Sequence, residues 1–588
     1  MRRTWVIGAA LLALTVWPGT PLAVLAWSLH SAAGSTARLM QERSAAEAAL
    51  VAPAPPAPLV RAVSTNLARV SGDLLTAAWA LDWLGNEGEW PAVGAADRTL
   101  RDGIQGSLEV ARAAATVWRA AIGRRAGISQ AVRVALAQLP ESALGLRDLS
   151  QAARHLPVPA QWRRAVTRAA PLLSRLAAVR RPLAEALGFP HPARYLVLLQ
   201  DAAELRATGG LVVAYGWLTL RQGRPALRFG GGIQALSRRV RVRVPAGSLL
   251  HRFFGESRLS LLNANDRLGG PASTAAILRL YRSVPGAPPV VGAVLVNSWW
   301  IATLFGMSGP VAVPSPAGRV VLTAATAPRQ LEQLAERDQV PGVPRMAFLG
   351  PVMRELAARL MPRGVPSLPL VAALGAGVRS GGVLWEPGGR ALARLAGALG
   401  WSGALWPTPA GGNYLMLVNQ NFGGLKDNLY LGQRAAVTVV GRREQVRLVL
   451  TLRRRVTAQN AWLLGSYEGW VSVVVPRGTR VVRATGFVSP VTVTSGASPA
   501  RTVVGGAVTV PVRLRAPSSA AAISLILQLP RDVAPDAPLL VQAQPGWRPG
   551  STRFTITLGG RTAEWDPGAG VLVRRRGRGL AAAARWGP

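Results

Sequence analysis

The first pattern along the chain is a long run without charge near the N-terminus. Thr4 to Ala37 contains no Asp, Glu, Lys or Arg, and its apolar part covers residues 5–27, close to the ~20 residues that a helix needs to cross a bilayer. Arg2 and Arg3 precede the run, which predicts a cytoplasmic N-terminus and an extracytoplasmic bulk. A cleaved signal peptide is the alternative, and it would also export the chain.

The second pattern has the period of amphipathic helices. Between residues 38 and 188 the chain is rich in Ala, Leu and Arg, with apolar residues at spacings of three and four, which predicts a helical stalk or bundle. The stretch 51–58 (VAPAPPAP) predicts a stiff, extended spacer at its start.

Strands and helices alternate from Pro190 onward. Tyr195–Gln200 and Leu211–Leu220 are apolar runs of strand length that flank a polar loop at 201–210, and Arg221–Arg224 (RQGR) has the composition of a hairpin turn. Ser273–Tyr281 and Trp299–Phe305 predict helices, Val290–Asn297 predicts a buried strand, and 325–400 is mainly helical in pattern. Together these elements predict a layered α/β domain.

From residue 411 the pattern is that of an all-β region. Five apolar or alternating runs lie between turn signals: Tyr414–Val418, Ala435–Val440, Val446–Leu452, Trp470–Val475 and Val508–Leu514. The expected fold class is therefore multidomain α+β, with a transmembrane anchor (1–37), a helical stalk (38–188), an α/β core (189–410), a β-region (411–490), a β-sandwich-like domain (491–573) and a basic, flexible tail (574–588).

Charge and composition limit the binding partners and the kinds of catalytic or metal site that the sequence predicts. The net charge is +40, from 68 basic and 28 acidic residues, yet no nucleic-acid-binding motif is present. For an exported chain, acidic envelope polymers or anionic lipids are the expected partners. Cysteine is absent, the four histidines have no metal-ligand spacing, and no phosphate-binding P-loop, serine elbow or HExxH motif occurs. The sequence predicts no metal site and leaves catalysis and oligomeric state open.

Two polar segments are the candidates for an anion or pyrophosphate site. Asp201, Glu204 and Arg206 precede Thr208-Gly209-Gly210, and Asn263, Asn265 and Asp266 follow another apolar stretch. Guanidinium, amide and carboxylate groups would suit an oxyanion with or without Mg²⁺. The alternative is a pair of solvated turns that never meet, with Glu204 and Arg206 ion-paired and the glycines needed only for a turn.

Two further features stand out by their charge. Lys426, followed by Asp427 and Asn428, is the only lysine among the 68 basic residues. Because an ammonium is compact where a guanidinium is not, we expect a specific structural pairing, with Asp427 or a backbone carbonyl as partner; ligand contact and chance are the alternatives. The arginines at 238, 239, 241 and 243 would form either a polyanion-binding stripe or a solvated edge strand.

Several ordered segments resemble domain-of-unknown-function family 4012. RYLVLLQDAAELRATGGLVVAYGWLTL (194–220) is similar to its strand, loop and strand signature, and further similar segments are NANDRLGGPAS (263–273), VVGAVLVNSWWIATLFGMSGPVAV (290–313), GWSGAL (400–405), NYLMLVNQNFGGLKDNLYL (413–431) and YEGWVSVVVPRGTRVVRATG (467–486). The anchor and stalk fit the layout of this family.

The core of that family distantly resembles the LytR-CpsA-Psr phosphotransferases, which use Arg and Asp residues around a pyrophosphate and a divalent metal. This chain has Gly269, Val291 and Asn297 where the family tends to have Asp, and metal-assisted transfer needs acidic ligands. We therefore expect a non-catalytic binding or scaffold protein of the cell envelope without a cofactor. The alternative is a phosphotransferase that attaches lipid-pyrophosphate-linked glycopolymers to the wall, and only under this alternative would Mg²⁺ be a cofactor.

Overall fold

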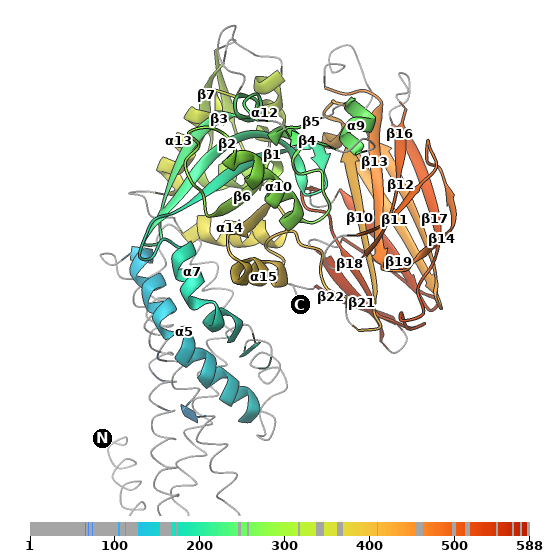
Figure 1. Cartoon of the computed structure of the whole chain (residues 1–588), viewed down its shortest axis with the longest axis horizontal. Coiled ribbons are helices and arrows are strands. Elements are labelled where there is room, and N and C mark those ends of the chain that lie inside the picture. The colour runs from blue at the N-terminus through green and yellow to red at the C-terminus, as the bar shows by residue number, and fades with distance from the viewer. Residues whose placement is uncertain are drawn as a thin grey trace, which may run out of the picture. The chain divides into compact units, whose positions relative to one another are not determined.

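The structure is a computed structural model (Figure 1), and it describes residues 127–152, 174–240 and most of 242–584. Gaps within the last range are 245–247, 256–257, 316–317, 337–345, 362–367, 409, 454–462, 497–500, 512–517, 549–550, 567–569 and 577–578; positions 65, 69, 73, 104, 105, 112, 167, 170 and 171 are also described. Contacts divide the chain into two units, one made of residues 1–192, 220–225 and 364–369, and the other of the remainder.

The first unit is described mainly by two helices. Helix α5 spans Gly127–Ala152 and α7 spans Arg180–Ala186, both within the range predicted to be helical. The guanidinium of Arg133 lies 5.7 Å from the ring centre of Phe189. The predicted membrane segment 5–27 and the spacer 51–58 lie outside the described residues. Among the helices that are described, none has the length and apolar character needed to cross a membrane.

A five-stranded sheet forms the centre of the second unit. Its order is β3-β2-β1-β6-β9, with β1 and β6 parallel and β6 and β9 antiparallel. The predicted hairpin turn is confirmed: Gln222 (φ 51°) and Gly223 (φ 76°) both have the positive φ of a two-residue type I′ turn. The strands are β1 (Ala193–Arg206), β2 (Gly209–Arg221), β3 (Arg224–Gly232), β6 (Gly292–Asn297) and β9 (Val383–Pro387).

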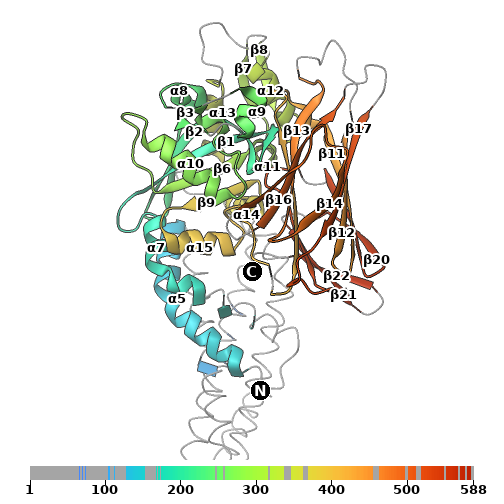
Figure 2. The same cartoon turned by 45° about the vertical axis from the view of Figure 1, so that its right-hand side comes forward.

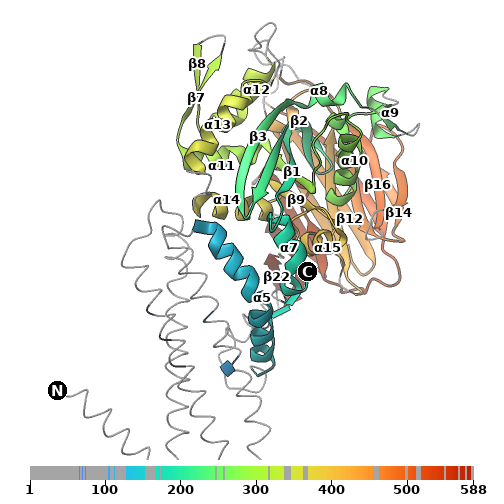
Figure 3. The ribbon, with the colours of Figure 1, turned by 60° about the vertical axis from the view of Figure 1, so that its left-hand side comes forward.

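Helices cover both faces of this sheet, as the alternation of strand and helix patterns predicts. On one face Ile277 and Leu280 of α10 (Gly270–Arg282) join Leu196 and Leu198 of β1 in a buried cluster. Four helices cover the other face (Figure 3): α11 (Ser298–Ser308), α12 (Ala327–Glu336), α13 (Leu349–Leu360) and α14 (Leu368–Arg379). Their apolar side chains form one buried cluster with side chains of the sheet.

Short elements complete this half of the unit: α8 (Ile233–Ser237), β4 (Val242–Arg243), α9 (Leu249–Phe254), β5 (Arg258–Leu259), β7 (Val311–Ser315), β8 (Gly318–Leu322) and α15 (Arg390–Ala398). The arginines at 238 and 239 follow α8 rather than alternating along a strand. The strand predicted at 238–243, whether as a polyanion-binding stripe or as a solvated edge, is therefore wrong at 238 and 239, because a helix ends there; position 241 lies outside the described residues.

Two antiparallel-rich sheets form the rest of the unit, with one apolar core between them. One sheet has the order β15-β16-β13-β10-β18-β21-β22 and the other β14-β17-β12-β11-β19-β20. The strands are β10 (Asn413–Asn421), β11 (Leu431–Val440), β12 (Arg443–Leu452), β13 (Tyr467–Pro476), β14 (Arg480–Thr485), β15 (Thr492–Gly496), β16 (Arg501–Val510), β17 (Ser519–Gln528), β18 (Leu539–Gln542), β19 (Thr552–Leu558), β20 (Arg561–Trp565), β21 (Gly570–Arg576) and β22 (Gly579–Ala584).

The sandwich differs from the predicted pattern in two places. Strands from both sides of residue 490 share each sheet, so the segments 411–490 and 491–573 build one sandwich. The flexible tail expected from residue 574 is wrong for most of its length, because β21 continues to Arg576 and pairs with β22. The alanine-rich sequence of β22 has low strand propensity, and its pairing with β21 overrides that preference.

Strand β10 joins the sandwich to the α/β half. All nine of its residues are buried, as expected for a strand covered on both faces. Leu415 and Leu417 point into the core between the two sheets, while Tyr414, Met416 and Val418 pack with Leu405 and Trp406. The seven-stranded sheet thus adjoins the α/β half, and the six-stranded sheet lies on the far side (Figure 2).

Candidate functional site

Strand β1 carries the first group of candidate residues. The predicted loop at 201–210 is wrong, since β1 extends to Arg206 and β2 begins at Gly209, which leaves Ala207 and Thr208 as the turn. Asp201, Glu204 and Arg206 are all buried. The charges that suggest a solvated loop are buried because partners distant in sequence surround them.

Lys426 is the main partner of the two carboxylates. It immediately precedes the short 3-10 helix η3 (Asp427–Leu429). Its Nζ lies 2.6 Å from Asp201 Oδ2 and 2.7 Å from Glu204 Oε1. Helix α12 supplies two more carboxylates, with Glu336 Oε1 at 3.3 Å and Glu332 Oε2 at 3.4 Å from Nζ. The only lysine of the chain is therefore buried among four carboxylates, a group that we name the Lys426 cluster.

The charged groups of this cluster shift one another's pKa values. Burial alone lowers the pKa of Lys426, but attraction to Asp201 and the glutamates outweighs it and raises that pKa above its ordinary value. Burial likewise raises the pKa of Asp201, but the ammonium outweighs burial and holds it below the usual value. Burial and repulsion from Asp201 raise the pKa of Glu332 well above its ordinary range. Glu332 therefore binds a proton more readily than an ordinary glutamate does.

Arg206 is buried beside the Lys426 cluster, and its donors point to groups of the protein. Nε donates to Asn263 Oδ1 at 3.2 Å, and Nη1 donates to the carbonyl oxygens of Leu205, at 3.0 Å, and Asn421. Nη2 lies 4.0 Å from Glu204 Oε2. The guanidinium carbon is 5.2 Å from the ring centre of Phe422, a distance suited to a cation–π contact. Nε and Nη1 therefore donate to groups of the protein, and Nη2 lies at ion-pair distance from Glu204.

The second candidate segment meets the first. Asn263 accepts from Arg206, and Asn265 Nδ2 donates to the carbonyl of Gly210 at 2.6 Å. Asp266 is partly exposed, and burial raises its pKa to about 6 against the attraction of Arg267 and Arg206. The two segments are thus not solvated turns far apart, and their amide groups serve to fasten β1 and β2 to the segment at 263–266.

The glycines of the turn approach the chain itself. A Cβ added at Gly210 would lie 1.9 Å from the carbonyl oxygen of Asp201. A Cβ at Gly209, where φ is +143°, would lie 2.2 Å from the side chain of Gln200. Both positions need glycine because the backbone packs closely there, which supports the structural role of these residues.

The two residues after Lys426 have separate roles. Asp427 Oδ1 accepts from the backbone N–H of Gly465 at 2.9 Å, and burial raises the pKa of Asp427 to about 6. Asn428 Oδ1 accepts from the backbone N–H of Leu205 at 3.2 Å. The pairing of Lys426 with Asp427 or a carbonyl is wrong: the lysine reaches across to β1 and α12 instead.

Sequence reasoning missed Glu332 and Glu336. They lie four residues apart on α12, so both carboxylates face the same side of the helix. This spacing was the available signal, but nothing in it points to a partner 90 or more residues away.

In the part of the chain that the structure describes, no three His, Asp or Glu side chains are arranged to hold a metal ion. Mg²⁺ does not fit the Lys426 cluster, because the ammonium occupies the position that the carboxylates surround.

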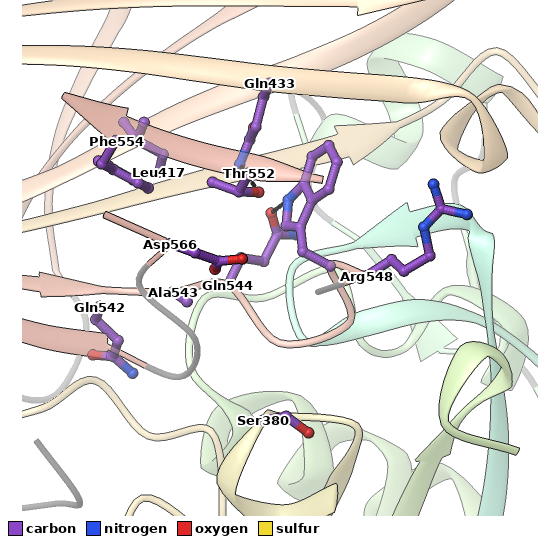
Figure 4. A pocket seen from close by; sticks show the side chains of 11 residues that line it. Ser380, Leu417, Gln433, Gln542, Ala543, Gln544, Arg548, Thr552, Phe554 and Asp566 are labelled. Atoms are coloured by element: carbon purple, nitrogen blue, oxygen red, sulfur yellow. Dashed lines mark hydrogen bonds between the residues drawn. The ribbon is translucent and has the colours of Figure 1, made fainter. Parts of the chain in front are cut away.

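A separate cavity is lined by residues from both sheets of the sandwich (Figure 4). Its volume is about 40 Å³, and its lining includes Gln433, Gln544, Trp547, Thr552 and Phe554. Trp547 Nε1 donates to Gln544 Oε1 at 2.8 Å, and Gln433 Nε2 donates to Thr552 Oγ1 at 3.0 Å. Since one water needs roughly 10–15 Å³ by this measure, the cavity suits a few waters rather than a pyrophosphate or a sugar.

Comparison with known proteins identifies a family for part of the chain. Residues 191–334 match the model of a family described as a protein of unknown function (DUF4012). This part of the chain belongs to the DUF4012 family. The match begins just before β1 and ends within α12, so Asp201, Glu204, Arg206 and Glu332 lie inside the DUF4012 segment and Lys426 lies outside it. No curated protein and no solved structure matches the chain significantly.

Proposed function

We propose that the chain is a membrane-anchored protein of the cell envelope that binds acidic polymers without catalysing a reaction. The observation that carries the non-catalytic part is that Arg206 and Lys426 are buried and bind groups of the protein itself. A site for pyrophosphate transfer would need guanidinium donors and carboxylates directed at the substrate. Here both kinds of group fasten β1, α12 and η3 together.

The binding part of the proposal rests on charge. The chain carries +40, and outside the cytoplasm this charge attracts anionic polymers at the wall and anionic lipids. We expect the full-length protein to be retained on immobilised poly(glycerol phosphate) at low salt and released as salt rises. At physiological ionic strength, salt screens the attraction between exposed charges that are more than about 8 Å apart. Retention that does not change between low and high salt would contradict a surface electrostatic mode.

The topology belongs to the same proposal and has its own test. The uncharged run after Arg3 places the N-terminus inside and the bulk outside. Protease added to intact spheroplasts should digest the chain beyond about residue 40, while a cytoplasmic marker protein stays intact. Full protection of the chain in spheroplasts, with digestion after lysis, would reject the topology.

The phosphotransferase alternative rests on the convergence of Arg206, Asn263 and Asp266. Asp266 is the member of this group that is partly exposed. The burial of Arg206 among groups of the protein is the reason to prefer the non-catalytic proposal, and binding of a prenyl pyrophosphate distinguishes the two.

A further inference from the structure

The outward face of the six-stranded sheet carries arginines at regular positions. In β12, Arg443 and Arg447 are exposed while Glu444, Val446 and Leu448 are buried, as the two-residue period of a strand requires. The same alternation in β11 and β19 directs Arg434 and Arg553 outward. In β14, a register shift between Val481 and Arg483 leaves both Arg480 and Arg483 exposed. We name this surface the arginine face; its members are Arg434, Arg443, Arg447, Arg453, Arg480, Arg483 and Arg553.

Strand register places these arginines next to one another. Arg434 of β11 and Arg553 of β19 are direct partners on adjacent parallel strands. Arg447 pairs with Ala436, two residues along β11 from Arg434. Adjacent strands are about 4.8 Å apart and alternate residues about 6.7 Å apart along a strand. Three guanidinium groups therefore emerge from one small area.

Gly432 brings a fourth guanidinium to the same area. A Cβ at Gly432 would lie 2.9 Å from Nε and from Nη2 of Arg453, so the absence of a side chain leaves room for that arginine. At the other end of the sheet, Arg443 and Arg480 are both partners of Gln528. The arginine face thus extends from β14 to β19.

These arginines have little opposing charge. Within the described part of the chain none of the seven forms an ion pair, in contrast to Arg359 with Glu355 and Arg575 with Asp536. At the outward positions of the six strands, Glu564 of β20 is the one carboxylate. Like charges on directly opposed residues destabilise a sheet, so the pair Arg434 and Arg553 costs stability that a bound anion would offset.

We infer that the arginine face binds a linear, phosphate-bearing polymer of the envelope. Guanidinium groups bind phosphate oxygens through two parallel hydrogen bonds, and several in sequence would hold successive phosphates of one chain. The inference rests on the proposed function, which supplies the compartment of the polymer.

A polymer fits the face better than a bilayer does. The outward side chains between the arginines include Ala436, Thr438, Ser524 and Thr555, and no aromatic residue occupies an outward position of these strands. Elements that lie on membranes usually insert Trp, Phe or Leu below the headgroups. Val440 and Val482 are exposed on these strands, but no Trp, Phe or Leu occupies an outward position. The arginine face therefore offers mainly charge and hydrogen-bond donors.

The test compares two variants of equal charge. One replaces Arg434, Arg447, Arg453 and Arg553 by Gln; the control replaces the exposed Arg279, Arg282, Arg390 and Arg394 of α10 and α15 by Gln. Binding of the full-length protein to poly(glycerol phosphate) is measured near 0.15 M salt. We expect at least about a tenfold loss of affinity in the first variant and less than about threefold in the control, with unchanged circular dichroism in both.

Each outcome decides the inference. Equal losses in the two variants would mean that net charge alone binds the polymer, and an unchanged first variant would mean that another surface binds it; either result overturns this inference and leaves the proposed function standing. Wild-type protein that does not bind the polymer would reject the proposed function as well. Tighter binding of phosphatidylglycerol vesicles or of DNA than of the polymer, lost in the first variant, would overturn the choice of partner.

Discussion

Lys426→Met is expected to destabilise the second unit by about 3–5 kcal/mol, the usual cost of removing one partner from a buried ion pair. Methionine keeps the length of the lysine stem but leaves Asp201, Glu204 and Glu336 without their shared ammonium. Thermal unfolding followed by tryptophan fluorescence should show a midpoint lowered by on the order of 5–10 °C.

The pH dependence of this loss distinguishes charge from packing. Without the ammonium, the buried carboxylates bind protons more readily in the folded state, so the variant should recover part of its stability as pH falls from 8 to 5. Glu336→Gln is the matched control, because its side chain is 24% exposed and removal of its charge leaves the ammonium in place. A midpoint deficit of Lys426→Met that is the same at both pH values would contradict the electrostatic account.

Glu386→Gln is expected to stabilise the protein at pH 8, by on the order of 2–4 kcal/mol. Glu386 of β9 is buried and its Oε1 has no hydrogen-bond partner. Burial raises its pKa from 4.5 to about 8. Between these values the folded state keeps a proton that the unfolded state releases, so this group lowers stability progressively as pH rises from about 4.5 to 8.

The measurement is the unfolding midpoint of wild type and variant at several pH values from 5 to 8. Glutamine cannot ionise, so the variant should gain stability at pH 8, change little at pH 5, and show a flatter profile. Glu468→Gln, at an exposed position of β13, serves as the control. Parallel profiles for wild type and Glu386→Gln would show that Glu386 does not titrate in this range.

Local sequence patterns predicted several helices, strands and turns. The RQGR turn, α10 and β6 follow from turn composition and apolar period, and each is found at or near its predicted position. The mixed α/β class and the β-rich C-terminal region follow from the same patterns. The turn and α10 were predictable because neighbours in sequence determine their hydrogen bonds. β6 was predictable from its continuous apolar run, although its partners β1 and β9 are distant in sequence.

Long-range partners account for the failures. Asp201 to Arg206 has the composition of a loop, and it forms a strand because Lys426 and Asn263 pair its charges. The sharing of two sheets across residue 490 depends on pairs such as β13 with β16 and β11 with β19. Strand spacing alone does not specify which strands pair. The sequence therefore could not show that the segments on either side of residue 490 share one sandwich.

The sequence identified the candidate residues but did not predict their structural role. Sequence reasoning selected Asp201, Glu204, Arg206, Asn263 and Lys426 by charge and by their polarity between apolar runs. The structure places all of them in one buried network. What the sequence lacks is the information that Lys426, more than 200 residues after β1, supplies the cation that an external metal would otherwise supply.

The basic residues of the chain fall into two groups, buried cations with a structural role and exposed arginines. Buried Arg206 and Lys426 hold β1, α12 and η3 together, whereas the arginine face is free of ion pairs within the described part of the chain. We propose that the outer sheet of the sandwich binds anions, whereas the buried charges in the segment that matches the DUF4012 family have a structural role.

Titration with a prenyl pyrophosphate tests this assignment most directly. Full-length protein and Asp266→Asn are titrated with the lipid at high salt and in the presence of Mg²⁺, conditions that suppress surface attraction and favour a phosphotransferase site. The account predicts no saturable binding to either protein, because Arg206 and Lys426 already bind groups of the protein. Saturable, salt-resistant binding to wild type that Asp266→Asn weakens would contradict the account and favour the phosphotransferase.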